Sequence, residues 1–237
     1  MKLYLYCLVE DVDVLSGPVR GIAGAPVRLE EIEGLGVLVS DFNDDAVPVT
    51  NENALDHAAA VRSVLDRTTP LPFRFGTLVT EQQLRSYVSA RKPALENNLA
   101  QVRGCVEMSV KIIWNVPRDK DEPEEPRHGI GTTFLAAKRR EILGSELRAA
   151  QAREVSAWLH NSVSGLTRAE KVTTQPSERL FLTAAHLVGR VNVERYREKT
   201  AEVRNERPDL HFLFSGPWPP YSFANIELEF KTQFGVS

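Results

Sequence analysis

Five histidines are the residues best able to ligate a metal or to transfer protons, and they are scattered along the chain. They are His57, His128, His160, His186 and His211. No two of them stand at the HxxxH or HExxH spacing that places two imidazoles on one face of a helix. A metal centre would have to be assembled by the tertiary fold alone, so we expect isolated structural or surface histidines.

Cysteine, glycine and acidic motifs offer no stronger case for catalysis. Cys7 and Cys105 lie far apart in apolar, strand-like runs, which predicts two buried, reduced thiols. The Gly129-Ile130-Gly131 run lacks the third glycine of a dinucleotide fingerprint and follows a loop, so helix capping is its expected role. The acidic pairs Asp44-Asp45 and Glu124-Glu125 fall in loops, where neighbouring carboxylates diverge into solvent. We therefore predict that the protein is not an enzyme and that it uses no metal and no cofactor.

The net charge and composition of the chain disfavour nucleic-acid-binding, secreted and membrane-spanning proteins. The 237 residues carry a net charge of −3, with 42% hydrophobic and 26% charged residues. That balance supports a buried core and calls for neither nucleic acid nor an anionic membrane as partner. The opening apolar run, Leu3 to Val9, is as short as a strand and is followed by Glu10 and Asp11, which disfavours a signal peptide. Because no apolar stretch approaches the roughly 20 residues that span a bilayer, we expect a soluble, cytoplasmic protein.

Strands are expected first in the N-terminal part of the chain. Short apolar runs predict strands at 3–9, 27–31 and 35–40, and a Glu33-Gly34 turn would join the last two as a hairpin. After the Pro70-Leu71-Pro72 break, we expect residues 73–77 to be extended.

Three helices are then expected before residue 104. The first, over about 53–67, would be capped by Asn53. Its apolar face is predicted from helical spacing to consist of Leu55, Ala58, Ala59, Val61 and Leu65. Thr80, with Gln83 three residues later, predicts a capping box at the start of the second helix. That helix would end before Pro93, which would sit in the first turn of the third.

From residue 105 onward the expected order is strand, helix, strand, strand, helix, strand. The strand signals lie at 106–112, 166–174, 179–188 and 210–214, and the helical ones at 133–163 and 192–206. This is the order of a ferredoxin-like fold. We predict an α+β chain of two domains: an N-terminal mixed α+β domain over 1–104, and a C-terminal ferredoxin-like (βαββαβ) domain over 105–237. The second would carry a solvated loop insertion at 117–128 and a C-terminal extension with one short strand at 225–230.

Ferredoxin-like folds include RNA-recognition modules, so a small-ligand or RNA-binding module is the alternative function for this domain. An RNA-binding strand of that kind places aromatic side chains on a basic platform. Phe212 and Phe214 instead alternate with core spacing. The residues therefore do not favour RNA as a partner.

Four segments, taken together, resemble the gas vesicle protein F/L family (GvpF and GvpL). They are Tyr4-Leu5-Tyr6, PLPFRFGT at 70–77, GCVEMSVK at 104–111 and SGPWPPYSF at 215–223. They occur in the family's order and span nearly the whole chain, and the last is the most specific. Cys7 is a small departure, because that place is often held by glycine.

The resemblance implies a non-catalytic accessory or minor structural protein that supports gas vesicle assembly and is associated with gas vesicles in the cytoplasm. The implied partners are the main shell protein, which is small and very hydrophobic, and other gas vesicle accessory proteins, with no nucleic acid and no membrane. A chaperone-like binder of such a partner needs exposed apolar surface and no reactive group. One candidate surface is the apolar side of the 133–163 helix. The other candidate partner interface consists of Phe73, Arg74, Phe75, Trp218, Pro219, Pro220 and Tyr221.

Two physical interpretations of the proline-rich 215–223 segment remain open. Prolines fix φ, so the segment could be a rigid turn whose Trp218 and Tyr221 lock onto the core. Alternatively, the same aromatic side chains could form an exposed ledge that anchors a partner. The Phe73-Arg74-Phe75 segment has the same two interpretations.

Overall fold

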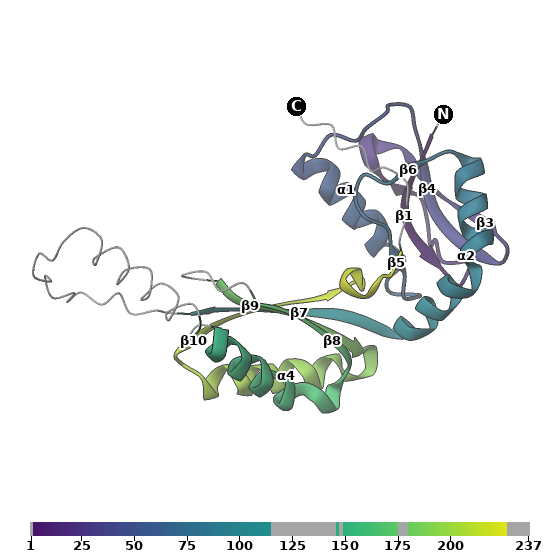
Figure 1. The fold of residues 1–237 in the computed structure, drawn as a ribbon. Helices are drawn as coiled ribbons and strands as arrows, with labels where there is room; N and C mark the ends of the chain where they lie inside the picture. The colour runs from purple at the N-terminus through teal and green to yellow at the C-terminus, as the bar shows by residue number, and fades with distance from the viewer. Residues whose placement is uncertain (1, 115–145, 147–148, 175–179, 227–237) are drawn as a thin grey trace, which may run out of the picture. The chain divides into compact units, whose positions relative to one another are not determined.

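The computed structural model describes residues 2–114, 146, 149–174 and 180–226. The chain divides into two compact units, one drawn from residues 1–107 and 217–237 and the other from residues 108–216. Each unit is an α+β structure with its own sheet (Figure 1). No helix within the described ranges is long and apolar enough to cross a membrane.

The sheet of the first unit has the order β2-β3-β4-β1-β5, and β6 also pairs with β1. Its strands are β1 (Lys2–Val9), β2 (Val19–Arg20), β3 (Pro26–Ile32), β4 (Leu35–Phe42), β5 (Leu71–Pro72) and β6 (Leu78–Val79). Every residue of β1 from Leu3 to Val9 is buried, because the strand has neighbours on both edges and is covered on both faces. The prediction of a central strand here is confirmed.

The predicted hairpin is also confirmed. β3 and β4 pair antiparallel, with Ile32 opposite Leu35. The two turn residues, Glu33 and Gly34, have φ values of 53° and 83°. Positive φ at both central positions gives the turn a twist that matches the paired strands, and glycine adopts it without a Cβ clash.

The helices of the first unit, α1 (Asn51–Arg62) and α2 (Glu81–Val102), lie on opposite sides of this sheet (Figure 1). The cap predicted for α1 was wrong. Thr50 caps it, and its hydroxyl accepts the Asn53 N–H at 3.2 Å. The capping box predicted for α2 is confirmed, because the Thr80 and Gln83 side chains each accept the other's backbone N–H.

Two further predictions for this part were wrong. Pro93 lies inside α2, so the second and third predicted helices are one. A proline there forgoes one backbone hydrogen bond, and the apolar residues buried on both sides of it, Val88 and Leu95, hold the helix on the sheet regardless. The 73–77 segment is not extended throughout: it contains a turn at Phe75-Gly76, where Gly76 has φ 81°.

The apolar face predicted for α1 was partly wrong. Leu55, Ala58 and Ala59 are exposed, and the buried arc of the helix is His57, Ala60 and Val61. Both arcs have helical spacing, so periodicity alone does not choose between them. In the fold the arc with the histidine faces the core, where Nδ1 of His57 lies 2.8 Å from the Tyr4 hydroxyl.

The sheet of the second unit has the order β10-β7-β9-β8. Its strands are β7 (Cys105–Trp114), β8 (Thr167–Thr174), β9 (Leu180–Gly189) and β10 (Leu210–Trp218). A helix over 149–163 and α4 (Val193–Glu206) cover one face of it (Figure 1). The core between them contains Val110, Ile112, Ala152, Val155, Leu159, Leu182, Ala184, Val203, Leu210 and Phe212. The four strands and α4 were predicted close to their observed bounds.

The apolar side of the helix over 149–163 is part of this core. Ala152, Val155, Leu159 and Val163 are at most 2% exposed. Within 149–163 the apolar side of the helix therefore faces the core, and the prediction that it faces a partner was wrong for this part of the 133–163 helix. The rest of that predicted helix, the 117–128 insertion, the glycine run at 129–131 and most of the predicted strand at 225–230 lie outside the described residues. Both cysteines are free and buried, as predicted.

Candidate functional site

We call residues 217–226 the signature segment, because they contain most of the SGPWPPYSF segment at 215–223. The signature segment belongs to the first unit, where two of its prolines are buried. Pro219 and Pro220 are buried. A short 3₁₀ turn, η4 (Tyr221–Phe223), follows, and the Pro220 carbonyl accepts the N–H groups of Phe223 and Ala224, each at 3.0 Å. The proline rings fix φ at two adjacent positions, so the segment holds one conformation at little cost in chain entropy.

Glu107 on β7 holds this turn in place through two hydrogen bonds with Ser222. Its carboxylate accepts the Ser222 backbone N–H at 2.7 Å and the Ser222 hydroxyl at 2.8 Å. The residue is only 8% exposed. A carboxylate with so little contact with water requires hydrogen-bond donors, and Ser222 supplies two. In the sequence Glu107 stands between the apolar residues Val106 and Met108, an alternation typical of a polar strand face, so the sequence alone gives no sign of this contact.

Asn98 on α2 fastens the end of the segment. Its side-chain NH₂ donates to the Phe223 carbonyl at 3.3 Å, and its side-chain oxygen accepts the Asn225 N–H at 3.0 Å. The amide thus pairs with the segment as a neighbouring strand would, and it is 5% exposed. Residues from α2, β7 and the C-terminal segment are thereby joined into one structure.

The candidate interface residues divide into two groups by exposure. Phe73, Pro219 and Pro220 are buried, and the Phe73 N–H donates to the Tyr6 carbonyl at 2.9 Å. Phe75 is half-buried. The accessible members are Arg74, Trp218 and Tyr221, and the two aromatic residues are 41% and 40% exposed.

Trp218 adjoins the outer side of α1. The guanidinium carbon of Arg62 lies 5.7 Å from the centre of the Trp218 ring, a cation–π distance. Positions three, four and seven residues apart share one face of a helix. Arg62 therefore lies on the same face as Ala58, Ala59 and Leu55, and Leu55 is 69% exposed.

We call this set of exposed residues the α1–Trp218 surface. It consists of Leu55, Ala58, Ala59, Arg62 and Trp218. Sequence reasoning named Trp218 as an interface residue but missed the α1 members, because Leu55, Ala58 and Ala59 were assigned to the core. The signal was present as a second helical stripe on α1, and only the fold decides which of two stripes is left outside.

A buried polar cluster lies on the inner side of α1. The Tyr4 hydroxyl is 2.8 Å from Nδ1 of His57 and accepts the Gly76 N–H at 3.2 Å. The hydroxyl proton has no other acceptor among the described residues, so it donates to Nδ1 and the imidazole carries its own proton on Nε2. Four aromatic rings surround this imidazole, those of Tyr4, Tyr6, Phe75 and Tyr221, with centres 5.7 to 6.4 Å away.

His57 is uncharged at neutral pH in this setting. Burial lowers its pKa to about 4, and the nearby Phe73 backbone opposes this change only in part. Nε2 is buried without a hydrogen-bond partner among the described residues. Burial likewise raises the pKa of Tyr4 and Tyr6 above the usual tyrosine value. The cluster therefore supports the fold beneath Tyr221 and holds no group poised to exchange protons near pH 7.

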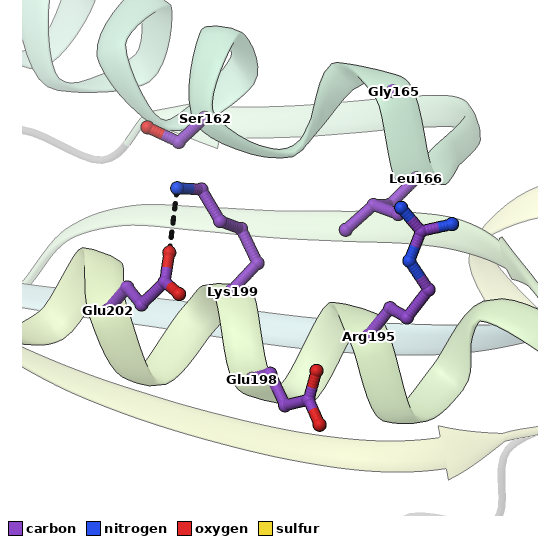
Figure 2. Close-up of a pocket in the computed structure, with 7 residues that line it drawn as sticks. All are labelled: Ser162, Gly165, Leu166, Arg195, Glu198, Lys199 and Glu202. Atoms are coloured by element: carbon purple, nitrogen blue, oxygen red, sulfur yellow. Dashed lines mark hydrogen bonds and ion pairs between the residues drawn. The ribbon is translucent and has the colours of Figure 1, made fainter.

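A shallow groove of about 340 Å³ lies between two helical segments of the second unit (Figure 2). It is lined by Ser162, Gly165, Leu166, Arg195, Glu198, Lys199 and Glu202. Lys199 forms an ion pair of 2.8 Å with Glu202, and Figure 2 shows the Arg195 and Glu198 side chains pointing apart. A binding pocket needs convergent polar groups, which this groove lacks. In the part of the chain that the structure describes, no group of three or more His, Cys, Asp or Glu could hold a metal ion.

Comparison with known proteins gives one consistent family. The family model described as gas vesicle synthesis protein GvpL/GvpF matches residues 2–225. Gas vesicle protein L2 of Halobacterium salinarum is 26% identical over 252 residues, covering 93% of this chain and 90% of the relative. Gas vesicle protein F1 of the same organism is 25% identical over 239 residues, covering 99% and 98%. The crystal structure of the gas vesicle protein GvpF from Anabaena sp. PCC7120 has the same fold, with a TM-score of 0.78, 18% identity and coverage of 96% and 97%.

Proposed function

Because the chain belongs to the GvpL/GvpF family of gas vesicle synthesis proteins, we propose that it supports gas vesicle assembly by binding the main shell protein through the α1–Trp218 surface. In this proposal the protein performs no reaction and uses no cofactor. It is associated with gas vesicles in the cytoplasm, and its other partners are gas vesicle accessory proteins.

The observation that carries the proposal is the exposure of apolar side chains on a rigid base. Leu55 and Trp218 of this surface are 69% and 41% exposed. Exposed apolar surface of this kind is typical of protein–protein contact sites. The Glu107–Ser222 and Asn98–Phe223 hydrogen bonds order the segment before any partner arrives. Binding would then lose little conformational entropy.

The chemistry of the partner suits such a surface. The shell protein of the family is very hydrophobic, so an unassembled copy needs its apolar surface covered. α1 offers Leu55, Ala58 and Ala59, and Trp218 adds a large ring of the kind that anchors interfaces. The guanidinium of Arg62 lies over that ring, so the surface also offers a positive charge at its edge.

We also propose that the second unit is a ferredoxin-like domain. Its strand order, β10-β7-β9-β8, supports this, as do the helical segment between β7 and β8 and α4 between β9 and β10. In this domain the two edge strands of the sheet are β8 and β10. The domain would act as a scaffold, since its described helices bury their apolar sides within it.

A pull-down with the purified shell protein tests the functional proposal. Trp218→Ala should weaken binding by about tenfold or more, which corresponds to about 1.4 kcal/mol. Val191→Ala is the matched control, because Val191 is 92% exposed and lies in the second unit. Full binding by a folded Trp218→Ala variant would remove the signature segment from the interface.

A further inference from the structure

A chain of four hydrogen-bonded side chains runs through the second unit. Nδ1 of His160, on the helix over 149–163, lies 2.6 Å from Oε2 of Glu170 on β8. The other oxygen of Glu170 lies 3.1 Å from Nε2 of His186 on β9. Nδ1 of His186 lies 2.6 Å from the hydroxyl of Tyr196 on α4. These four side chains therefore connect the helix over 149–163 and α4 with strands β8 and β9.

The row of four hydrogen-bonded side chains extends from the solvent into the core. The side chains of His160 and Glu170 are 54% and 15% exposed. His186 and Tyr196 at the other end are 0% and 1% exposed. The proposed function makes no use of these residues, which lie in the other unit from the α1–Trp218 surface.

The hydrogen bonds fit one arrangement of protons. An ionised Glu170 can only accept, so Nδ1 of His160 and Nε2 of His186 both donate to it. Nδ1 of His186 then carries no proton and accepts the Tyr196 O–H. In this arrangement both ring nitrogens of His186 and the hydroxyl of Tyr196 have a hydrogen-bond partner, and His186 is neutral.

One added proton disrupts this arrangement. On Nδ1 of His186 it would point at the Tyr196 hydroxyl proton, and the hydroxyl would have to turn away. Among the described residues the Tyr196 hydroxyl has no second hydrogen-bond partner, and it is buried. The hydroxyl oxygen would then accept the N–H of Nδ1, and the hydroxyl proton would be buried without an acceptor. A buried donor without an acceptor is costly, so protonation favours a state in which α4 has moved and water reaches the hydroxyl.

We infer that this chain of side chains is a proton-linked latch: uptake of a proton by His186 releases Tyr196 and loosens α4 and the helix over 149–163 from the sheet. The titratable groups that face His186 are Glu170 from β8, His160 from the helix over 149–163 and Tyr196 from α4. Burial lowers the pKa of His186, and the hydrogen bond with Glu170 opposes this only in part.

We call the state with the His186–Tyr196 hydrogen bond closed and the state in which α4 has moved open. The pKa of His186 is lowered by burial in the closed state, so this histidine takes up a proton on opening. The closed state therefore has its full stability above the ordinary histidine pKa of about 6.5 and loses it as the pH falls from there towards the pKa of the closed state.

Hydrogen exchange of the full chain tests the latch. Protection factors of amides in 149–163 and 193–206 should fall about tenfold per pH unit below about pH 6.5, since opening takes up one proton. His186→Gln should remove that slope whatever its own stability. His211→Gln should keep it, because His211 is exposed on β10. Protection that does not change with pH in the wild-type chain would overturn the inference.

Nitrogen-15 NMR of the unmutated protein tests the same idea without any variant. At pH 7.5 the spectrum should show His186 protonated on Nε2 and unprotonated on Nδ1, with Tyr196 as the donor to Nδ1. The opposite tautomer, or a charged imidazole at that pH, would contradict the arrangement on which the latch depends.

Discussion

The Asn98 side chain and the Phe223 backbone, which are 125 positions apart, are joined by a buried hydrogen bond of 3.3 Å. The same amide accepts the Asn225 N–H. One residue of α2 thus satisfies both a carbonyl and an N–H of the C-terminal segment. The contact fixes the segment that presents Trp218 and Tyr221, so the exposed ring surface depends on residues that themselves touch no partner.

Replacing Asn98 by aspartate should break this clamp while hardly changing its shape. A carboxylate oxygen would then face the Phe223 carbonyl, and two acceptors would oppose each other in a buried site. We expect the free energy of unfolding of the first unit to fall by about 1–3 kcal/mol in urea unfolding experiments. Asn97→Asp is the control, since Asn97 is exposed on the same helix, and it should change stability by less than about 0.5 kcal/mol. Equal effects of the two substitutions would show that the clamp contributes nothing.

His57 should make the first unit sensitive to acid. Its pKa is about 4 in the fold and about 6.5 in an unfolded chain. The depressed value means that the unfolded state binds the proton first as the pH falls, so stability is constant above about pH 7 and declines from there to pH 4. The loss should reach about 3 kcal/mol.

Urea unfolding of the wild-type chain and of His57→Leu at pH 7.5 and pH 4.5 measures this loss. The wild-type advantage over the variant should shrink by that amount on acidification, because leucine cannot titrate. An advantage that is the same at both pH values would show that His57 does not carry the effect.

A bulky charge in the middle of the α1–Trp218 surface should block binding without unfolding the chain. Ala59 is exposed on α1, and arginine has nearly the same helix propensity as alanine. We expect Ala59→Arg to weaken shell-protein binding about tenfold or more, with a change in stability below about 0.5 kcal/mol. Ala100→Arg, at an exposed position of α2, is the matched control and should bind normally. If Ala59→Arg also binds normally, the outer side of α1 is not in the interface.

Features that depend on a few neighbouring residues could be predicted from the sequence. The Thr80–Gln83 capping box and the Glu33-Gly34 turn are local, since each is decided by residues no more than three positions apart. In the second unit β7, β10 and α4 were found because their apolar residues repeat with a clear period.

Features that depend on distant contacts could not be predicted. The two stripes of α1 have the same spacing, and the hydrogen bond between His57 and Tyr4, 53 positions away, shows which one faces inward. Pro93 is tolerated inside α2 because tertiary burial outweighs the lost hydrogen bond. Glu107 is buried beneath Ser222, 115 positions away, which supplies two hydrogen-bond donors to its carboxylate. The members of the candidate interface were taken from the two segments that resemble the family, at 70–77 and 215–223, and their division into buried and exposed groups required the fold.

The emission of Trp218 tests the central claim most directly. Substituting phenylalanine for Trp114 and Trp158 leaves Trp218 as the sole tryptophan. If the shell protein covers the α1–Trp218 surface, its addition should shift the emission of this partly exposed ring to shorter wavelength, and the shift should saturate with the binding measured by pull-down. Shell protein that binds fully while the Trp218 emission stays unchanged would contradict the account.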